Sequence, residues 1–177
     1  SKGTREQVWH FFDRQSCLSC HNANAGFILG VNSRQLNSQH QLAALSEDGY
    51  FHESLAAGRI ESLPSLVDPE DTTATLEQRA HSYLDVNCSS CHREGGARAN
   101  FFAELHHKAH QSARTAMPLQ GDFGLSNARV VTPGDPFRSL LYYRMEKFGK
   151  GRMPFVGGHE IDRDGLELVR QWIEQMP

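Results

Sequence analysis

The chain has 177 residues with 18 basic and 21 acidic side chains, and its formal net charge is −3 at pH 7. This length allows one domain or two small ones. A pI near 6.3 indicates no basic surface for nucleic acid, so we expect no nucleic-acid partner. The mean hydropathy of −0.54 and the shortness of every apolar run exclude a membrane span within this sequence.

The first predicted element is a helix that leads to a cysteine motif. A capping-box pattern, T-x-x-Q, opens this helix at Thr4. Apolar residues follow at helical spacing, at Val8, Phe11 and Phe12. The helix leads to C-L-S-C-H at residues 17–21, and the pattern recurs 71 residues later, with a capping box at Thr75 and C-S-S-C-H at 88–92. We therefore predict a degenerate duplication with one motif at the end of a helix in each copy.

The C-x-x-C-H motif is typical of c-type haem attachment. Two thiols add to the porphyrin vinyl groups, and the adjacent histidine ligates the iron. Two copies therefore predict two covalently bound haem c groups. The attachment residues are Cys17 and Cys20 with the iron ligand His21, and Cys88 and Cys91 with the iron ligand His92.

Other uses of the four cysteines are less favoured. Zinc ribbons usually place their second cysteine pair much closer than the separation of Cys20 and Cys88. A thioredoxin-like redox pair needs a βαβ context, and the sequence shows none. Disulfide bonds are the least favoured alternative. We expect haem attachment to use all four cysteines.

Between the motifs, the sequence predicts loops and one short helix. The apolar run 26–31 is broken by glycines and is expected to form a buried loop against haem. Residues 39–45 predict a short helix, and 62–73 predicts a surface connection. We place the boundary between two units near residue 72.

After the second motif, residues 93–100 predict a Gly/Ala-rich loop, and 101–131 shows only weak periodicity. Asp135-Pro136 is a capping pair, and the helix it opens should end at Gly149. Its apolar stripe comprises Phe137, Leu140, Leu141, Met145 and Phe148. A last helix is predicted to be capped at Asp164-Gly165. Its apolar side comprises Leu166, Val169, Trp172, Ile173 and Met176.

A low-spin haem iron takes a second axial ligand, usually a methionine sulfur or a histidine nitrogen. Met153-Pro154 lies in a glycine-rich loop between the last two predicted helices. A proline stiffens such a loop, and glycines permit close approach to a porphyrin. We therefore predict Met153 as the distal ligand of the haem at Cys88/Cys91, and we expect Met145 to belong to the core.

The distal ligand of the first haem stays open. No methionine precedes Met117, so the first iron takes a histidine, borrows a ligand from the second half or keeps an open position. The local candidates are His40 and His52, and the remote one is Met117. For each of them a solvated or hydrogen-bonded side chain is the simpler interpretation.

The other histidines are predicted not to ligate iron. His10 and His81 repeat at the same offset but lie on the predicted haem helices, so we interpret them as packing or surface residues. His106, His107 and His110 form a cluster at mixed spacing. This cluster predicts a polar helix face or, alternatively, a surface metal site.

Taken together, these motifs resemble the diheme c-type cytochrome domains at the C-terminal end of larger exported bacterial proteins. The resemblance covers most of the chain from Cys17 onward. Its residues are Leu29-Gly30, Arg34 to Asn37, Gln41-Leu42, Arg79-Ala80, Tyr83-Leu84, Asn87-Cys88, Cys91 to Arg93, Gly95-Gly96, Pro133 to Pro136, Ser139-Leu140, Arg152 to Pro154 and Trp172-Ile173. Positions 40 and 52 depart from the family pattern, so no distal ligand for the first haem follows from it.

The resemblance implies an all-α fold of two tandem class I cytochrome c-like units. The first, truncated unit would cover residues 1–72 and the second 73–177. It also implies electron transfer between redox proteins, with other domains of a larger protein as possible partners. Because c-type haem is attached outside the bacterial cytoplasm, we expect a periplasmic or extracellular protein; a signal peptide, if one existed, has been removed or lies outside this sequence. The alternative is a diheme peroxidase-like enzyme, or a sensor of a small ligand, with an open first haem.

Overall fold

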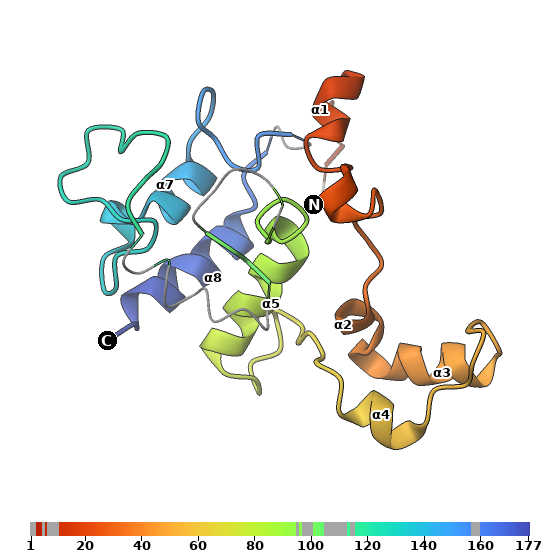
Figure 1. The fold of residues 1–177 in the computed structure, drawn as a ribbon. Helices are drawn as coiled ribbons and strands as arrows, with labels where there is room; N and C mark the ends of the chain where they lie inside the picture. The colour runs from red at the N-terminus through yellow and green to blue at the C-terminus, as the bar shows by residue number, and fades with distance from the viewer. Residues whose placement is uncertain are drawn as a thin grey trace.

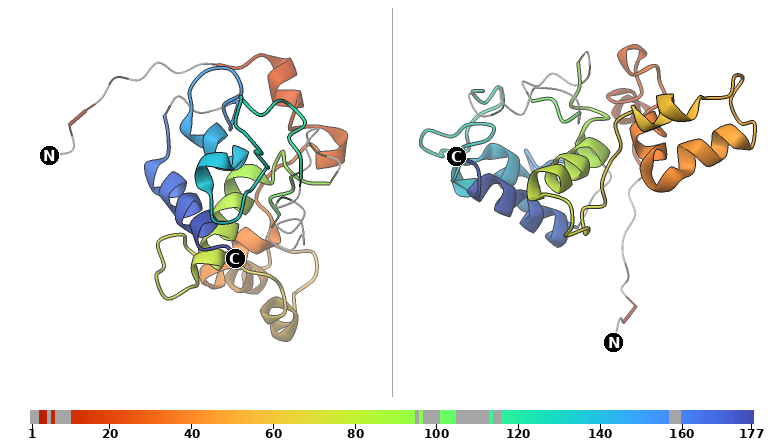
Figure 2. Two further views of the ribbon diagram at one scale, coloured as in Figure 1. Left: turned by 90° about the vertical axis from the view of Figure 1, so that its left-hand side faces the viewer. Right: turned by 90° about the horizontal axis from the view of Figure 1, so that it is seen from below.

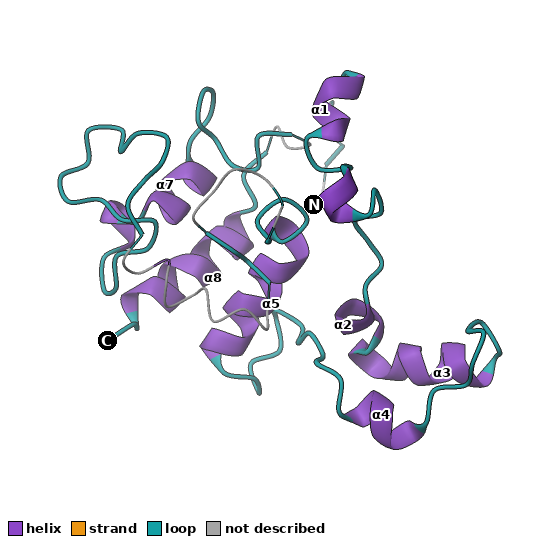
Figure 3. Cartoon of the chain, viewed as in Figure 1, coloured by secondary structure: helices purple, strands orange, loops and turns teal. Residues whose placement is uncertain are grey.

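The computed structural model describes residues 3–4, 6, 11–94, 96, 101–104, 113, 116–156 and 160–177. Within these residues the regular structure is helical (Figure 3). They contain no β-strand, and their one β-type pairing is an isolated bridge between Arg129 and Ser139. This agrees with the predicted all-α class, whereas the two tandem cytochrome-like units stay a prediction. In the described segments, no helix combines the length and apolar character that a membrane crossing requires.

The helices form two groups along the chain. Their bounds are α1 (Arg14–Leu18), η1 (Ala23–Ala25), α2 (Ser33–Leu36), η2 (Ser38–His40), α3 (Gln41–Glu47), α4 (Ala57–Glu61), α5 (Leu76–Cys88), η3 (Pro136–Arg138), α7 (Leu140–Glu146) and α8 (Arg163–Glu174). In the first group α3 contacts both α2 and α4, and in the second group α8 contacts both α5 and α7. Two views show the α2–α4 group beside the α5, α7 and α8 group (Figures 1 and 2).

The hydrophobic core lies where α5 packs on α8. The predicted capping box of α5 is confirmed, because Thr75 Oγ1 accepts a hydrogen bond from Gln78 N and the Gln78 side chain accepts one from Thr75 N. The predicted apolar side of α8 is also confirmed, since all five of its residues are buried. The cap of α8 is Asp162, two residues before the predicted Asp164, because the Asp162 carboxylate accepts from Gly165 N.

Gly165 allows α5 and α8 to approach closely. A Cβ atom at this position would lie 2.2 Å from Tyr83 Cζ on α5. The Tyr83 hydroxyl donates to the Asp162 carboxylate at 2.9 Å, which holds the ring over the glycine. The helix that leads to the second motif therefore packs closely on the C-terminal helix.

The predicted helix after Asp135-Pro136 is interrupted. Asp135 caps the short helix η3, and Ser139 then adopts an extended conformation (φ −92°, ψ 113°) before α7 begins. Leu140 and Leu141 are buried as predicted, and Met145 packs against the core. Phe137 and Phe148 are exposed, so the predicted apolar stripe is wrong at its first and last residues. Both residues lie outside α7, which is shorter than the periodicity indicates.

The first motif helix is also shorter than predicted. Helix α1 begins after Asp13, whose carboxylate accepts from Ser16 N at 2.7 Å, and Phe11 and Phe12 precede it and are exposed. The prediction of a helix running on from Thr4 is therefore wrong at residues 11–13, because Asp13 offers the cap at which the helix starts. Val8 and His10 lie outside the described residues.

The loop and helix predicted between the motifs are partly confirmed. Residues 27–31 form a loop, as predicted. Phe27, Ile28 and Val31 are exposed, so the described part of the protein chain does not bury them. Helix α3 covers Gln41–Glu47, two residues later than predicted, because Gln39 and His40 adopt positive φ angles of 51° and 64°.

A buried ion pair joins the two helix groups. Arg34 on α2 donates from Nε and Nη2 to the two carboxylate oxygens of Asp85 on α5, at 3.0 and 3.3 Å. The Asp85 side chain is fully buried. The Arg34 carbonyl accepts from Leu66 N, and the Ser82 hydroxyl oxygen accepts from Val67 N. The connection 62–73 thus lies against both groups, which its composition did not indicate.

Candidate functional site

Each C-x-x-C-H motif forms a helical turn. In the first motif, the Cys17 carbonyl accepts from His21 N at 2.9 Å. In the second motif, the Cys88 carbonyl accepts from His92 N at 2.8 Å. In both turns the first and second cysteine are three residues apart, so their side chains project from the same face. The predicted attachment residues therefore share one local geometry in both copies.

Both motif histidines are oriented by a backbone carbonyl. His21 Nδ1 lies 2.8 Å from the Phe27 carbonyl oxygen, and His92 Nδ1 lies 3.2 Å from the Phe101 carbonyl oxygen. A hydrogen bond from Nδ1–H selects the tautomer whose lone pair is on Nε2, which is the usual arrangement of a metal-ligating histidine. The donor set therefore fits an axial iron ligand in each motif.

His92 is more firmly held than His21. The segment that follows the second motif crosses it, because the His92 carbonyl accepts from Ala103 N at 2.7 Å and Phe101 and Ala103 are buried. Burial lowers the pKa of His92, the hydrogen bond to the Phe101 carbonyl opposes this shift, and the Arg144 charge lowers the pKa further. A neutral imidazole is the form that binds a metal.

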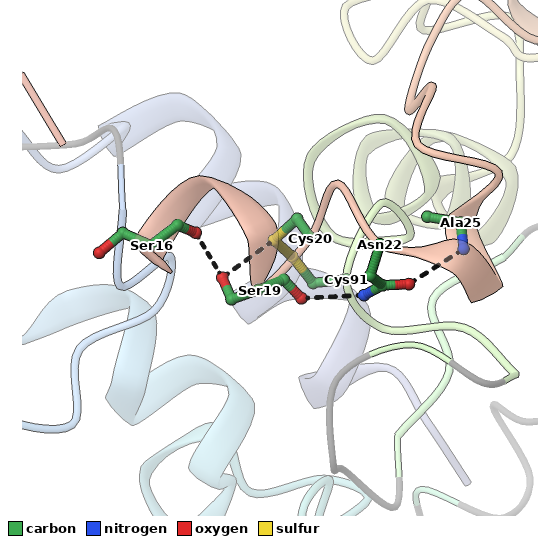
Figure 4. The surroundings of a disulfide bond; sticks show 6 residues. All are labelled: Ser16, Ser19, Cys20, Asn22, Ala25 and Cys91. Atoms are coloured by element: carbon green, nitrogen blue, oxygen red, sulfur yellow. Dashed lines mark hydrogen bonds between the residues drawn. A yellow bond between two sulfur atoms is a disulfide. The ribbon is translucent and has the colours of Figure 1, made fainter. Parts of the chain in front are cut away.

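One cysteine of each motif takes part in a disulfide bond. Cys20 is bonded to Cys91, with their Cα atoms 5.4 Å apart (Figure 4). The two partners are 71 residues apart, the offset of the sequence repeat, so the bond joins equivalent positions of the two copies. A sulfur atom in this bond cannot also form a thioether. The predicted haem attachment at Cys20 and Cys91 would therefore require a form of the chain in which this bond is open.

The two remaining cysteines have different surroundings. Cys17 is exposed on α1, whereas Cys88 ends α5 and packs against the hydrophobic core. Burial raises the pKa of the Cys88 thiol to about 12. The four predicted attachment cysteines thus comprise one bonded pair, one exposed thiol and one partly buried thiol.

Met153 lies in a loop that Arg144 contacts at two points. Met153 N donates to the Arg144 carbonyl at 2.9 Å, and the Arg144 guanidinium donates to the carbonyls of Gly151 and Gln120 at 2.8 and 3.1 Å. The same guanidinium influences the pKa of His92. Arg144 therefore holds the Met153 loop through hydrogen bonds, and its charge acts on His92. The sequence analysis did not identify this residue.

Phe123 also lies against the Met153 loop, at Gly151. Gly151 has a φ of +84°, and a Cβ atom there would lie 2.6 Å from Phe123 Cζ. Arg144 Cζ lies 4.6 Å from the centroid of the Phe123 ring. Beside the loop is a cavity of about 430 Å³. Gly151 is therefore required for the close contact with Phe123. The predicted close approach of a porphyrin to the glycines of this loop stays a prediction.

The candidates for the first iron's distal ligand are dispersed. His40 is an exposed residue at the start of α3, and His52 is exposed in the bend that follows this helix. The Met117 sulfur accepts a hydrogen bond from the Arg129 guanidinium. His81 packs edge-on against Trp172, with ring centroids 5.2 Å apart, which confirms its interpretation as a packing residue. The cluster of His106, His107 and His110 lies outside the described residues.

Exposed apolar side chains surround the first motif. Leu18, Phe27, Ile28 and Val31 are 44, 58, 76 and 69% exposed. Phe27 carries the carbonyl that orients His21, so these residues lie beside the predicted iron ligand. Contiguous exposed apolar surface usually marks a binding site. A flat apolar macrocycle such as haem fits this surface.

The zinc alternative would need a cluster of four ligands. A structural zinc ion requires four cysteine or histidine ligands at one point. Among the described residues, no three histidine, cysteine, aspartate or glutamate side chains gather where they could hold a metal ion. A haem iron needs only one imidazole and one further axial ligand from the protein.

In comparisons with family models, with curated proteins and with solved structures, nothing matched this chain. The function is therefore argued from the two motif turns and their surroundings.

Proposed function

We propose that this chain is a diheme c-type cytochrome module that carries electrons between redox proteins outside the cytoplasm. The observation that carries the proposal is that both C-x-x-C-H turns orient their histidine through an Nδ1 to carbonyl contact. Two independent turns with this arrangement support two axial ligands, His21 and His92. Bound haem would supply a one-electron Fe(III)/Fe(II) couple.

The chain's own residues would set the properties of the second haem. Cys88 and Cys91 would form its thioethers, His92 would ligate the iron, and Met153 would supply the opposite ligand. The Arg144 contacts that hold residues 151 and 153 support this assignment. Thioether ligation by methionine raises a haem's reduction potential.

The first haem would differ in its exposure. Cys17, Cys20 and His21 would hold it on an exposed turn beside the apolar loop 27–31. The exposure of His40 and His52 favours an open or labile sixth position at this iron. This observation supports a second candidate function, a peroxidase-like enzyme or a small-ligand sensor.

The proposed location is the bacterial periplasm or the extracellular space. Disulfide bonds persist mainly in oxidising compartments. The Cys20–Cys91 bond of the haem-free chain supports this location. The partners would be redox proteins or further domains of a larger exported protein.

Expression of the full chain together with cytochrome c maturation proteins tests the proposal. We expect a red protein that retains two haems per chain after denaturation, and one haem when both Cys88 and Cys91 are replaced by serine. A colourless product from wild-type chain would overturn the proposal. Electron paramagnetic resonance of the oxidised protein would then distinguish the two candidate functions. Two low-spin irons favour electron transfer alone, whereas a high-spin first iron with peroxide turnover favours the enzyme.

A further inference from the structure

The disulfide bond lies beside a second cysteine at each of its ends. Cys17 precedes Cys20 by one helical turn, and Cys20 N lies 3.3 Å from the Cys17 carbonyl oxygen. Cys88 precedes Cys91 in the same way, with a corresponding distance of 3.1 Å. Each end of the bond therefore has a thiol at the spacing that permits exchange within a C-x-x-C pair.

The two neighbouring thiols differ in access. Cys17 is exposed, and it belongs to α1, a helix of five residues none of which is buried. Cys88 packs against the hydrophobic core as the last residue of α5. Thiol–disulfide exchange requires the attacking sulfur to reach the bonded sulfur in line with the bond. The exposed Cys17 thiol can make this approach, whereas the packing of Cys88 against the core opposes it.

We propose that Cys17 opens the Cys20–Cys91 bond by internal thiol–disulfide exchange, so that the chain alternates between a crosslink of its two motifs and a Cys17–Cys20 pair. The Cys17 thiolate attacks Cys20 Sγ, and a Cys17–Cys20 bond forms as the Cys20–Cys91 bond breaks. The electron pair leaves on Cys91 Sγ, which takes up the proton that Cys17 released to solvent. The number of disulfides is unchanged, so no oxidant or reductant is needed.

This exchange has a consequence for the second motif. In the crosslinked form, Cys91 is blocked and the two motif turns are tied together. After exchange, Cys88 and Cys91 are both thiols, whereas the first motif is oxidised. An external dithiol would then supply two electrons and two protons to release Cys17 and Cys20. The second motif therefore becomes competent for thioether formation before the first one.

Peptide mapping of the haem-free full-length chain tests the proposal. Trypsin separates the motifs, because Cys17 and Cys20 fall in peptide 15–34 and Cys88 and Cys91 fall in peptide 80–93. The chain is kept in acid, where exchange stops, shifted to pH 8 and alkylated at intervals. We expect the linked peptides 15–34 and 80–93 to be replaced by peptide 15–34 with an internal disulfide and peptide 80–93 with two alkylated cysteines.

A matched pair of variants identifies the attacking thiol. Cys17→Ser should keep the two peptides linked at least about tenfold longer than wild type, and Cys88→Ser should exchange at the wild-type rate. Equal rates in C17S and wild type, an internal disulfide in peptide 80–93, or four alkylated cysteines at the first time point would each overturn the proposal. Circular dichroism of both variants checks that they are folded.

The outcome is independent of the proposed haem function. If the peptides behave as expected and the reduced chain never retains haem, the exchange stands and the cytochrome proposal fails. If wild-type chain binds two haems but its haem-free form has four thiols, the cytochrome proposal stands and the exchange fails.

Discussion

The first motif ends a helix of five residues with no buried side chain, whereas the second ends a helix of thirteen residues that contributes four buried ones. The backbone hydrogen bonds within the two turns are nearly the same. What differs is the packing partner, since α5 lies against α8 and α1 has no equivalent neighbour among the described elements. The motif thus determines its local turn, while burial of the histidine depends on the segment that packs on it.

The largest effect is expected from breaking the ion pair that joins the two regions. Replacing Asp85 with alanine leaves the mostly buried Arg34 guanidinium without its carboxylate partner. We expect the free energy of unfolding to fall by about 3 kcal/mol, measured by urea denaturation. As a control, Glu174→Ala removes an exposed contact of Arg170 and should change stability little. Equal stabilities of D85A and E174A would refute the role of this pair.

The next effect concerns the helix crossing that only the second region has. Gly165→Ala places a methyl group against the Tyr83 ring and should destabilise the chain by about 1 to 3 kcal/mol. Gly58→Ala in α4 is the matched control, because a Cβ atom there meets nothing within 4 Å. This helical substitution should stabilise the chain by about 0.5 to 1 kcal/mol. Equal melting temperatures of G165A and G58A would show that α5 and α8 do not pack as closely as described.

A smaller effect distinguishes the two histidines by pH. Burial lowers the pKa of His92 in the folded haem-free chain, so the unfolded chain binds the proton more tightly. The contribution of His92 to the free energy of unfolding should therefore be fully present above the pKa of the unfolded chain, about 6.5. It should decrease as the pH falls below that value, by at most about 1.4 kcal/mol per pH unit. His92→Gln should remove this contribution from the pH dependence of the melting temperature, whereas His21→Gln should leave it in place. An unchanged slope in H92Q would contradict the assignment.

The smallest effect on stability, and a specific one on the site, is expected at Arg144. In haem-loaded protein, Arg144→Ala should release the Met153 loop and reduce the share of His/Met low-spin iron, measured by electron paramagnetic resonance. Met153→Ala should abolish that signal, and Met145→Leu should preserve it because Met145 packs in the core. The signal of the first iron should be unchanged in all three variants. A wild-type spectrum for M153A would exclude this methionine as a ligand.

Local patterns allowed the most reliable predictions from sequence. The T-x-x-Q capping box of α5 and the apolar side of α8 depend on residues within one or two helical turns, and both are present. The helix ends were less predictable, because Asp13, Ser139 and Asp162 compete with nearby residues that offer similar caps or breaks.

Long-range contacts could not be predicted in the same way. The Arg34–Asp85 pair and the contacts of Arg144 join segments whose proximity arises only from tertiary packing. The Cys20–Cys91 bond had one signal in the sequence, since its two residues are separated by the repeat offset. The shared offset shows that the two cysteines occupy equivalent positions in the repeat. It does not show that they lie close together in space, so the bond could not be predicted from it. The predicted haem and iron ligands stay predictions.

Under the proposed haem attachment, the exposed row of Phe27, Ile28 and Val31 makes the immature chain behave differently in solution from the finished protein. An uncovered apolar edge favours aggregation and recognition by chaperones and proteases. Covering that edge would remove the signal for degradation. The supply of porphyrin would then govern how many molecules survive in the compartment, in addition to how many can carry an electron.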